Sequence, residues 1–137
     1  PFDHPWADDG PSWNLRGNGG LLSTARDLYR WYLALEGVEV LDERSKRALF
    51  RPRVREGPRA ESRYAYGWVV LDTPLGRVQW HNGGNGWSYA EVLRVPEAHA
   101  FVFWVTNHAR SRAGGWNLER LGGRLLTGDV GKRLVGQ

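Results

Sequence analysis

The hydrophobic positions after residue 20 repeat with helical spacing. The stripe consists of Leu28, Trp31, Tyr32 and Leu35, at positions i, i+3, i+4 and i+7. Ser23 or Thr24 can cap the start of this helix, and Asp27 lies in the first turn, where negative charge is favoured. Gly37 stands at a typical stop position. The pattern therefore predicts an amphipathic helix that begins at about residue 24 and ends before Gly37.

A second, shorter helix is predicted directly afterwards. The side chain of Asp42 can cap its start, and Pro52 disfavours helical structure in the residue before it. Residues 51–63 combine charged side chains with Pro52, Gly57 and Pro58. This composition is typical of an exposed loop.

From residue 64 onward the hydrophobic period changes from about 3.6 to about 2, which is typical of strands. Four strands are expected, at 64–71, 77–81, 89–95 and 100–107. Their short connections favour an antiparallel meander. Residues 117–126 place four leucines at helical spacing, which predicts a C-terminal helix packed on the sheet, although Gly122 and Gly123 weaken it or allow close approach.

The order helix, helix, four strands, helix predicts an α+β fold. Its expected parts are an extended segment at 1–18, a helical part at 19–63, and the sheet with the C-terminal helix at 64–126. A chain of 137 residues makes at most one domain. We expect residues 1–137 to form one partial domain.

Composition and charge narrow the function classes. The formal charge is +4, but the basic residues are scattered from Arg16 to Arg133, and acidic residues interrupt the densest stretch, at 44–63. A nucleic-acid face shows a clustered basic stripe, so we expect no nucleic-acid partner. Cysteine is absent and the four histidines have no metal-ligand spacing, which predicts neither a metal nor a cofactor. No apolar run is long enough to span a bilayer.

Two stretches carry the signature of a known family. Residues 19–28 read GGLLSTARDL, which resembles the GG-L-x-ST-x-x-DL helix start of the β-lactamase-related serine hydrolases: class C β-lactamases, DD-peptidases and related esterases. The second stretch comprises YGW at 66–68, HNGGNGW at 81–87, LRVPE at 93–97 and TN at 106–107. It looks like the family succession YGxGW, HxGGxxG, LRVPE and TN. Order and spacing agree over most of the chain.

The resemblance implies a β-lactamase/transpeptidase-like fold and an active-site wall on the strand that carries the His-x-Gly triplet. His81 would face the reacting acyl group or a substrate carboxylate, and Gly84 would give a backbone N–H to the oxyanion hole. Asn82 would contact substrate, Gly83 would leave room for it, and Trp87 would border the cleft. The alternative from the residues alone is a strand that ends in an Asn/Gly turn without a function.

The family's nucleophile is the serine of a Ser-x-x-Lys motif, and its second motif is Tyr-x-Asn. The residues three places after the serines are Leu15, Arg26, Ala48, Ala65, Glu91 and Gly114, and no tyrosine is followed by asparagine two places on. Both motifs belong upstream of the matched region. We therefore expect a C-terminal fragment that is inactive alone, while a natural relative without its catalytic half is the alternative.

The expected reaction of the parent protein is hydrolysis of an amide or ester through an acyl-enzyme. A β-lactam, a D-amino-acid peptide and a simple ester all remain open as substrates. A different class of function is a non-catalytic module that holds peptidoglycan or another glycan through Trp80, Trp87 and Tyr89, because indole rings stack on sugars. Most other tryptophans, such as Trp31 and Trp104, are predicted to lie in the core.

The last predicted strand, at 101–107, raises the question of partners. In the family fold, strands from the N-terminal end of the chain pair with it. Without them it would leave an unpaired edge, and such edges recruit other chains. We expect self-association through this strand, or complementation by the missing N-terminal part. Relatives are often exported, but the sequence has no signal segment from which a compartment follows.

Overall fold

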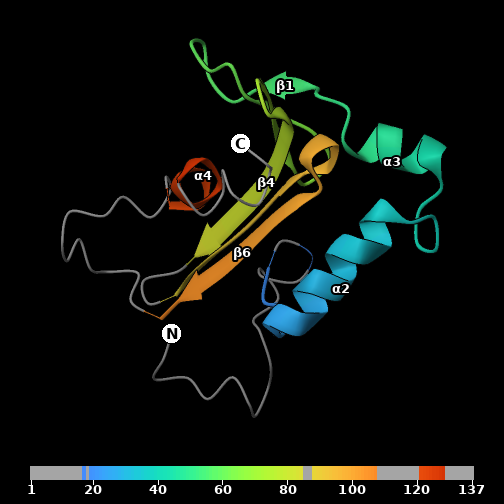
Figure 1. The fold of residues 1–137 in the computed structure, drawn as a ribbon. Coiled ribbons are helices and arrows are strands. Elements are labelled where there is room, and N and C mark those ends of the chain that lie inside the picture. The colour runs from blue at the N-terminus through green and yellow to red at the C-terminus, as the bar shows by residue number, and fades with distance from the viewer. Residues whose placement is uncertain (1–16, 18, 85–87, 108–120, 129–137) are drawn as a thin grey trace.

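The computed structural model describes residue 17 and residues 19–84, 88–107 and 121–128. The expected extended segment at 1–18 therefore lies outside the described residues except for residue 17. Trp87 also lies outside them. Within the described part, two helices precede an antiparallel sheet and a third follows it (Figure 1). The α+β prediction is confirmed.

Helices α2, Ala25–Glu36, and α3, Glu43–Leu49, form where the sequence predicts them. The Thr24 hydroxyl accepts a hydrogen bond from the backbone N–H of Asp27 at 3.1 Å. The Asp42 carboxylate accepts one from the N–H of Ser45 at 2.7 Å. Both contacts satisfy backbone donors that the first helical turn leaves without partners.

The sheet has six strands in the order of the chain, so each pairs antiparallel with the next. The strands are β1 Val54–Arg55, β2 Arg63–Tyr64, β3 Val69–Thr73, β4 Gly76–Gly84, β5 Tyr89–Val95 and β6 Ala100–Thr106. A short 3-10 helix, η2 Pro96–Ala98, joins the last two. The meander is as predicted, but the strand count exceeds the expected four.

The two additional strands come from one wrong boundary and one wrong loop assignment. The predicted strand 64–71 breaks after Tyr64, because Gly67 adopts a left-handed backbone with φ of 73° and the chain turns there. The N–H of Ala65 donates to the carbonyl of Trp68 at 2.7 Å and closes that turn. The predicted loop 51–63 contains β1, which pairs with β2 as a small hairpin at the end of the sheet.

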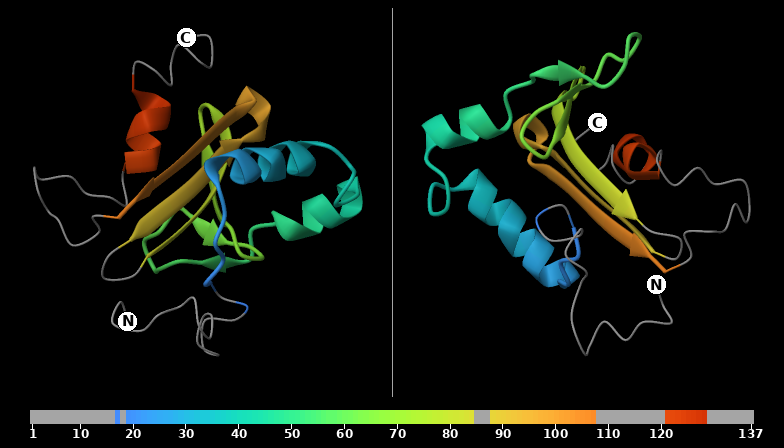
Figure 2. Two further views of the ribbon diagram at one scale, coloured as in Figure 1. Left: turned by 90° about the horizontal axis from the view of Figure 1, so that it is seen from below. Right: turned by 180° about the vertical axis from the view of Figure 1, so that it is seen from behind.

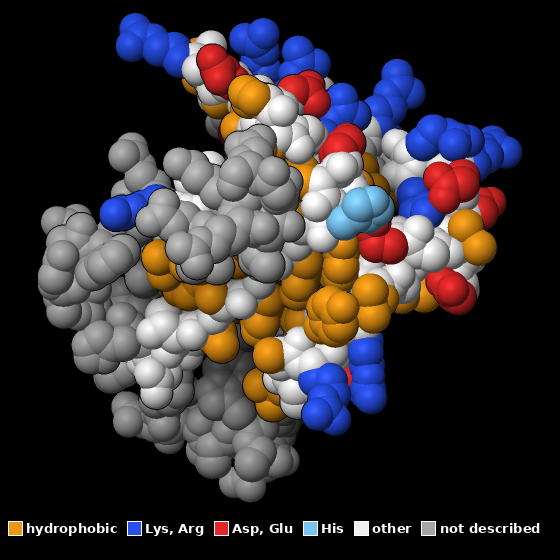
Figure 3. All heavy atoms as spheres, viewed as in Figure 1, with side chains coloured by type: hydrophobic (Ala, Val, Ile, Leu, Met, Phe, Trp, Pro, Cys, Tyr) orange, Lys and Arg blue, Asp and Glu red, His pale blue; other side chains and the backbone are white. Residues whose placement is uncertain are grey.

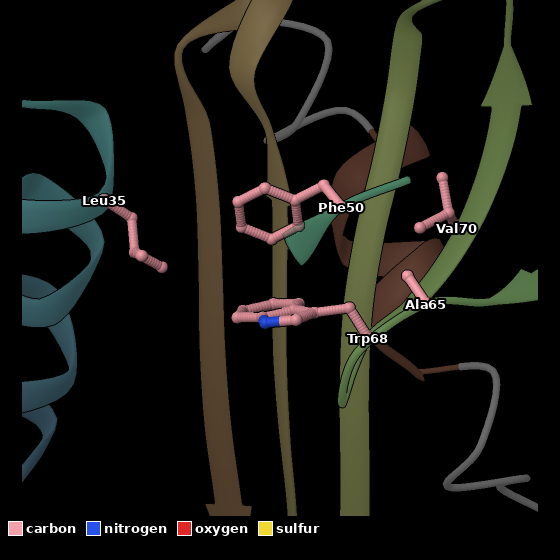
Figure 4. Packing of buried hydrophobic residues seen from close by; sticks show 5 residues of the cluster. All are labelled: Leu35, Phe50, Ala65, Trp68 and Val70. Carbon is pink, nitrogen blue, oxygen red and sulfur yellow. The ribbon is translucent and has the colours of Figure 1, made fainter. Parts of the chain in front are cut away.

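The helices cover opposite faces of the sheet. Helix α4, Leu121–Thr127, packs on one face, and α2 and α3 lie on the other (Figure 2). On the α4 face, the core contains Val78, Leu93, Val95 and Leu126. On the α2 face it contains Leu35, Phe50, Ala65, Trp68 and Val70, with Leu35 directed from α2 toward the rings of Phe50 and Trp68 (Figure 4).

The stripe on α2 is only partly buried. Tyr32 and Leu35 are buried, and the Tyr32 ring stacks on Phe101 of β6 with centroids 4.7 Å apart. Trp31 is 43% exposed, so its predicted core position is wrong for the described residues. The side of α2 that carries Tyr32 packs on the sheet, and the neighbouring Trp31 side chain stays partly exposed.

Candidate functional site

Strand β4 divides into two halves with different neighbours. The inner half, Gly76–Trp80, pairs with β3 on one side, and the last pair of that ladder is Val69 with Trp80. The outer half, His81–Gly84, pairs with β5 alone among the described strands, in a register that runs from His81–Val92 to Gly84–Tyr89. The strand predicted to end at His81 therefore continues through the whole His-Asn-Gly-Gly sequence.

The outer half offers backbone hydrogen-bonding groups along one side. In an antiparallel strand, successive residues direct their N–H and C=O groups to alternate sides. Two of the four outer residues therefore direct these groups away from β5, where no described strand pairs with them. An extended ligand can pair with such groups as an added strand does.

The imidazole of His81 is held by a tyrosine from another strand. The Tyr64 hydroxyl lies 2.9 Å from Nε2 of His81. The two rings meet edge to face, with centroids 6.2 Å apart and an angle of 68° between their planes. His81 is half-buried, and its Nδ1 has no hydrogen-bond partner among the described residues. One ring nitrogen is thus fixed by the protein, and the other remains available.

Asn82 and His81 project from opposite faces of the sheet, because side chains alternate along a strand. Asn82 lies opposite Glu91 of β5, on the face that α4 covers. The Glu91 carboxylate is buried and accepts hydrogen bonds from Nε1 of Trp104 at 2.7 Å and from the N–H of Gly122 at 3.0 Å. Burial raises the pKa of this carboxyl, and the two hydrogen bonds oppose that shift.

The two glycines of the outer half have different reasons to lack a side chain. A Cβ on Gly84 would lie 2.7 Å from the carbonyl oxygen of Ser88 and 3.1 Å from Cδ2 of Tyr89, so packing requires glycine there. A Cβ on Gly83 would meet no atom within 4 Å. Packing therefore does not require glycine at position 83, and the space beside it is open.

Behind the site, a buried ion pair joins β5 to α2. Nη2 of Arg94 donates to Oε1 of Glu36, and the guanidinium lies 4.9 Å from the centroid of the Phe50 ring. Burial lowers the pKa of the Arg94 guanidinium, while the Glu36 carboxylate opposes that shift. This pair fixes α2 against the face of the sheet on which His81 projects.

The described surface outside β4 carries basic side chains. Lys and Arg side chains gather over β1 and α3 (Figure 3). Within the described part of the chain, no group of histidines and carboxylates could hold a metal ion. The helices seen in that part are too short and too polar to cross a membrane.

The structure thus brings His81, Asn82, Gly83 and Gly84 together on one strand segment, as their adjacency in sequence requires. Sequence reasoning missed Tyr64, which reaches His81 from 17 positions away. Its only sequence signal is a place two residues before the Tyr-Gly-Trp motif.

Two of the three aromatic residues of the glycan-module alternative pack within the protein, and the third, Trp87, lies outside the described residues. Trp80 is partly buried against the α4 core, and Tyr89 stacks on Trp104 with ring centroids 5.2 Å apart. Trp80 projects from the face opposite to His81. Neither ring is presented as an open platform for a sugar.

The α+β fold and the His-x-Gly strand are features of the family of penicillin-recognising serine hydrolases. The sequence model of the family described as Beta-lactamase matches residues 1–122, and the chain belongs to this family. It is 33% identical over 95 residues to penicillin-binding protein 4* of Bacillus subtilis (strain 168), a match that covers 68% of this chain and 21% of that protein.

A solved structure resembles the chain as well. The octameric penicillin-binding protein homologue from Pyrococcus abyssi superposes with a TM-score of 0.68 at 18% identity, over 87% of this chain and 26% of that chain. At this identity the likeness shows the fold. The chain spans about a fifth to a quarter of the length of these two relatives.

Proposed function

We propose that the outer half of β4, His81–Gly84, forms one wall of an acyl-transfer site whose serine nucleophile lies outside this sequence. The observation that carries the proposal is the pairing of β4. Its outer half extends past β3, so backbone groups beside His81 have no partner among the described strands and can bind an extended substrate. Membership in the β-lactamase family supports the reaction class.

In this mechanism, the serine Oγ attacks the carbonyl of an amide or ester. The backbone N–H of Gly84 donates to the oxyanion that develops, and a preorganised donor of this kind is worth about 3–4 kcal/mol. Collapse of the tetrahedral intermediate expels the amine or alcohol, and water then releases the acyl group from the serine. The role of Gly84 requires its N–H to lie on the side away from β5.

The other outer residues position the substrate. His81 orients the substrate or assists proton transfer from its place beside Tyr64. Gly83 keeps the space beside the strand open. Asn82 contributes its backbone, because its side chain projects toward the α4 face. Trp87, which lies outside the described residues, borders the cleft in this proposal.

The nucleophile is assigned to a longer parent protein. No serine of this chain precedes lysine by three positions, and the chain matches only 21% of penicillin-binding protein 4*. We propose that residues 1–137 form the C-terminal part of one hydrolase domain and are inactive alone. A β-lactam, a D-amino-acid peptide and a simple ester are the candidate substrates.

Mass spectrometry after incubation with a chromogenic β-lactam and an activated ester tests this function. The 137-residue chain should gain no acyl group, whereas the longer parent should gain one on a serine outside it. In the parent, Gly83→Val should slow acylation about 100-fold, because the new side chain displaces the substrate. Gly57→Val is the matched control, since its Cβ also meets no atom within 4 Å. An acyl adduct on a serine of the short chain would overturn the proposal.

A further inference from the structure

The hydrogen bond between Tyr64 and His81 determines which ring nitrogen of His81 carries the proton. We propose that Tyr64 is a positioning residue that holds neutral His81 as the tautomer protonated on Nδ1, so that His81 offers substrate an N–H donor. The catalytic meaning of this inference rests on the proposed function. The tautomer itself depends only on the contact within this chain.

The direction of the hydrogen bond follows from the chemistry of its partners. A phenol hydroxyl is a good donor, and the unprotonated imidazole nitrogen is a much better acceptor than a phenol oxygen. The Tyr64 hydroxyl therefore donates to Nε2 of His81 across the 2.9 Å that separates them. Because Nε2 then accepts, the single proton of the neutral ring lies on Nδ1.

The geometry supports a positioning role and not a chance contact. The Tyr64 ring meets the imidazole edge to face, so the ring as well as the hydroxyl limits rotation of His81. The backbone carbonyl of Tyr64 accepts a hydrogen bond from the N–H of Arg53 at 3.0 Å, which ties β2 to the segment before β1. The turn at Gly67 returns the chain to β3 and leaves Tyr64 at the end of β2, within reach of His81.

The tautomer decides between the two roles left open for His81. A ring that accepts from Tyr64 through Nε2 has no free lone pair with which to take a proton from a nucleophile. Its Nδ1–H can donate to a substrate oxygen, including a carboxylate or an oxyanion. When the ring becomes protonated, Nε2–H donates to the Tyr64 oxygen, so the contact persists in both charge states. His81 is therefore a donor to substrate and not the general base.

Long-range proton–nitrogen NMR of the 137-residue chain, labelled uniformly with nitrogen-15, tests the inference. At a pH where the ring is neutral, His81 should show a protonated Nδ1 and an unprotonated Nε2. In Tyr64→Phe, the ring should shift toward the Nε2–H tautomer that free histidine prefers. Tyr66→Phe is the matched control. It removes the hydroxyl of the tyrosine two residues after Tyr64, and the ring of Tyr66 contacts Arg53.

His99 serves as an internal reference, because it is exposed at the far end of β5 and should be unchanged in both variants. An Nε2–H tautomer in the unmodified chain, or no change in Tyr64→Phe, would overturn the inference. The backbone amide spectrum verifies that each variant remains folded. The readout does not involve acylation, so failure of the parent to acylate would overturn the proposed function and leave the tautomer result standing.

Discussion

The two halves of β4 differ in what surrounds them. The inner half, Gly76–Trp80, pairs with β3 throughout and also with β5 at Gln79 and Trp80, and Val78 and Gln79 within it are buried. The outer half, His81–Gly84, has one neighbour among the described strands, and its two glycines are exposed. One strand thus supplies both a core element and a candidate binding edge. A rigid inner half fixes the position of the outer half, which preorganises backbone donors without a loop.

The largest expected effect is on the free energy of unfolding when an aspartate is introduced into each half of β4. Val78→Asp places a charge among Val95, Leu93 and Leu126, and should reduce the free energy of unfolding by about 3–5 kcal/mol. Gly83→Asp should change it by about 1 kcal/mol or less, because that position is exposed. Urea denaturation of both variants measures the difference. Equal losses would mean that the outer half is as tightly packed as the inner half.

The second effect concerns self-association of the chain and distinguishes two edges of the sheet, β6 and the outer half of β4. Strand β6 pairs only with β5 among the described strands, and the side chain of Val105 is 62% exposed. We propose that the chain self-associates through β6 and not through the outer half of β4. Val105→Lys should weaken the association tenfold or more, about 1.4 kcal/mol, because lysine on an edge strand opposes further pairing.

Sedimentation velocity over a concentration series measures this change, and hydrogen exchange locates the contact. Protection that rises with concentration should appear in β6, Ala100–Thr106. Protection at residues 81–84 instead would assign the association to the proposed substrate edge. A monomer at every concentration would refute self-association.

The smallest effect tests how the outer half is supported from the α4 face. Glu91 lies opposite Asn82, and burial raises the pKa of its carboxyl above the usual value of 4.5. The folded state therefore binds this proton more tightly than the unfolded state. Its stabilising contribution is complete below pH 4.5 and is lost as the pH rises through the raised pKa.

Glu91→Gln removes the titration and keeps an amide oxygen for the N–H groups of Trp104 and Gly122. The variant should show a flatter stability profile above pH 4.5 and should gain stability relative to the unmodified chain as the pH rises. Thermal denaturation between pH 4 and pH 8 measures both. Glu97→Gln is a control at an exposed carboxylate. Parallel profiles for Glu91→Gln and the unmodified chain would contradict the expectation.

Helix caps and hydrophobic periodicity in the sequence predicted those helices and strands whose boundaries depend on neighbouring residues. The caps at Thr24 and Asp42 predicted α2 and α3, and alternation predicted β5 and β6. The break after Tyr64 was missed, because a left-handed Gly67 is not visible in a period-2 pattern. The motif at 81–84 supplied every site candidate within the described residues. Tyr64 escaped because its link to His81 depends on how separate strands pack.

The meander order of the sheet also bears on how the chain assembles. Each strand finds its partner in the next segment of sequence, so every ladder closes a short loop at a small entropic penalty. The Glu36–Arg94 contact instead joins residues 58 positions apart. Local pairings of this kind favour rapid folding, whereas contacts of long sequence separation slow it. The connectivity thus favours early pairing of successive strands. Helix α2 packs on the sheet afterwards, and its Glu36 then pairs with Arg94.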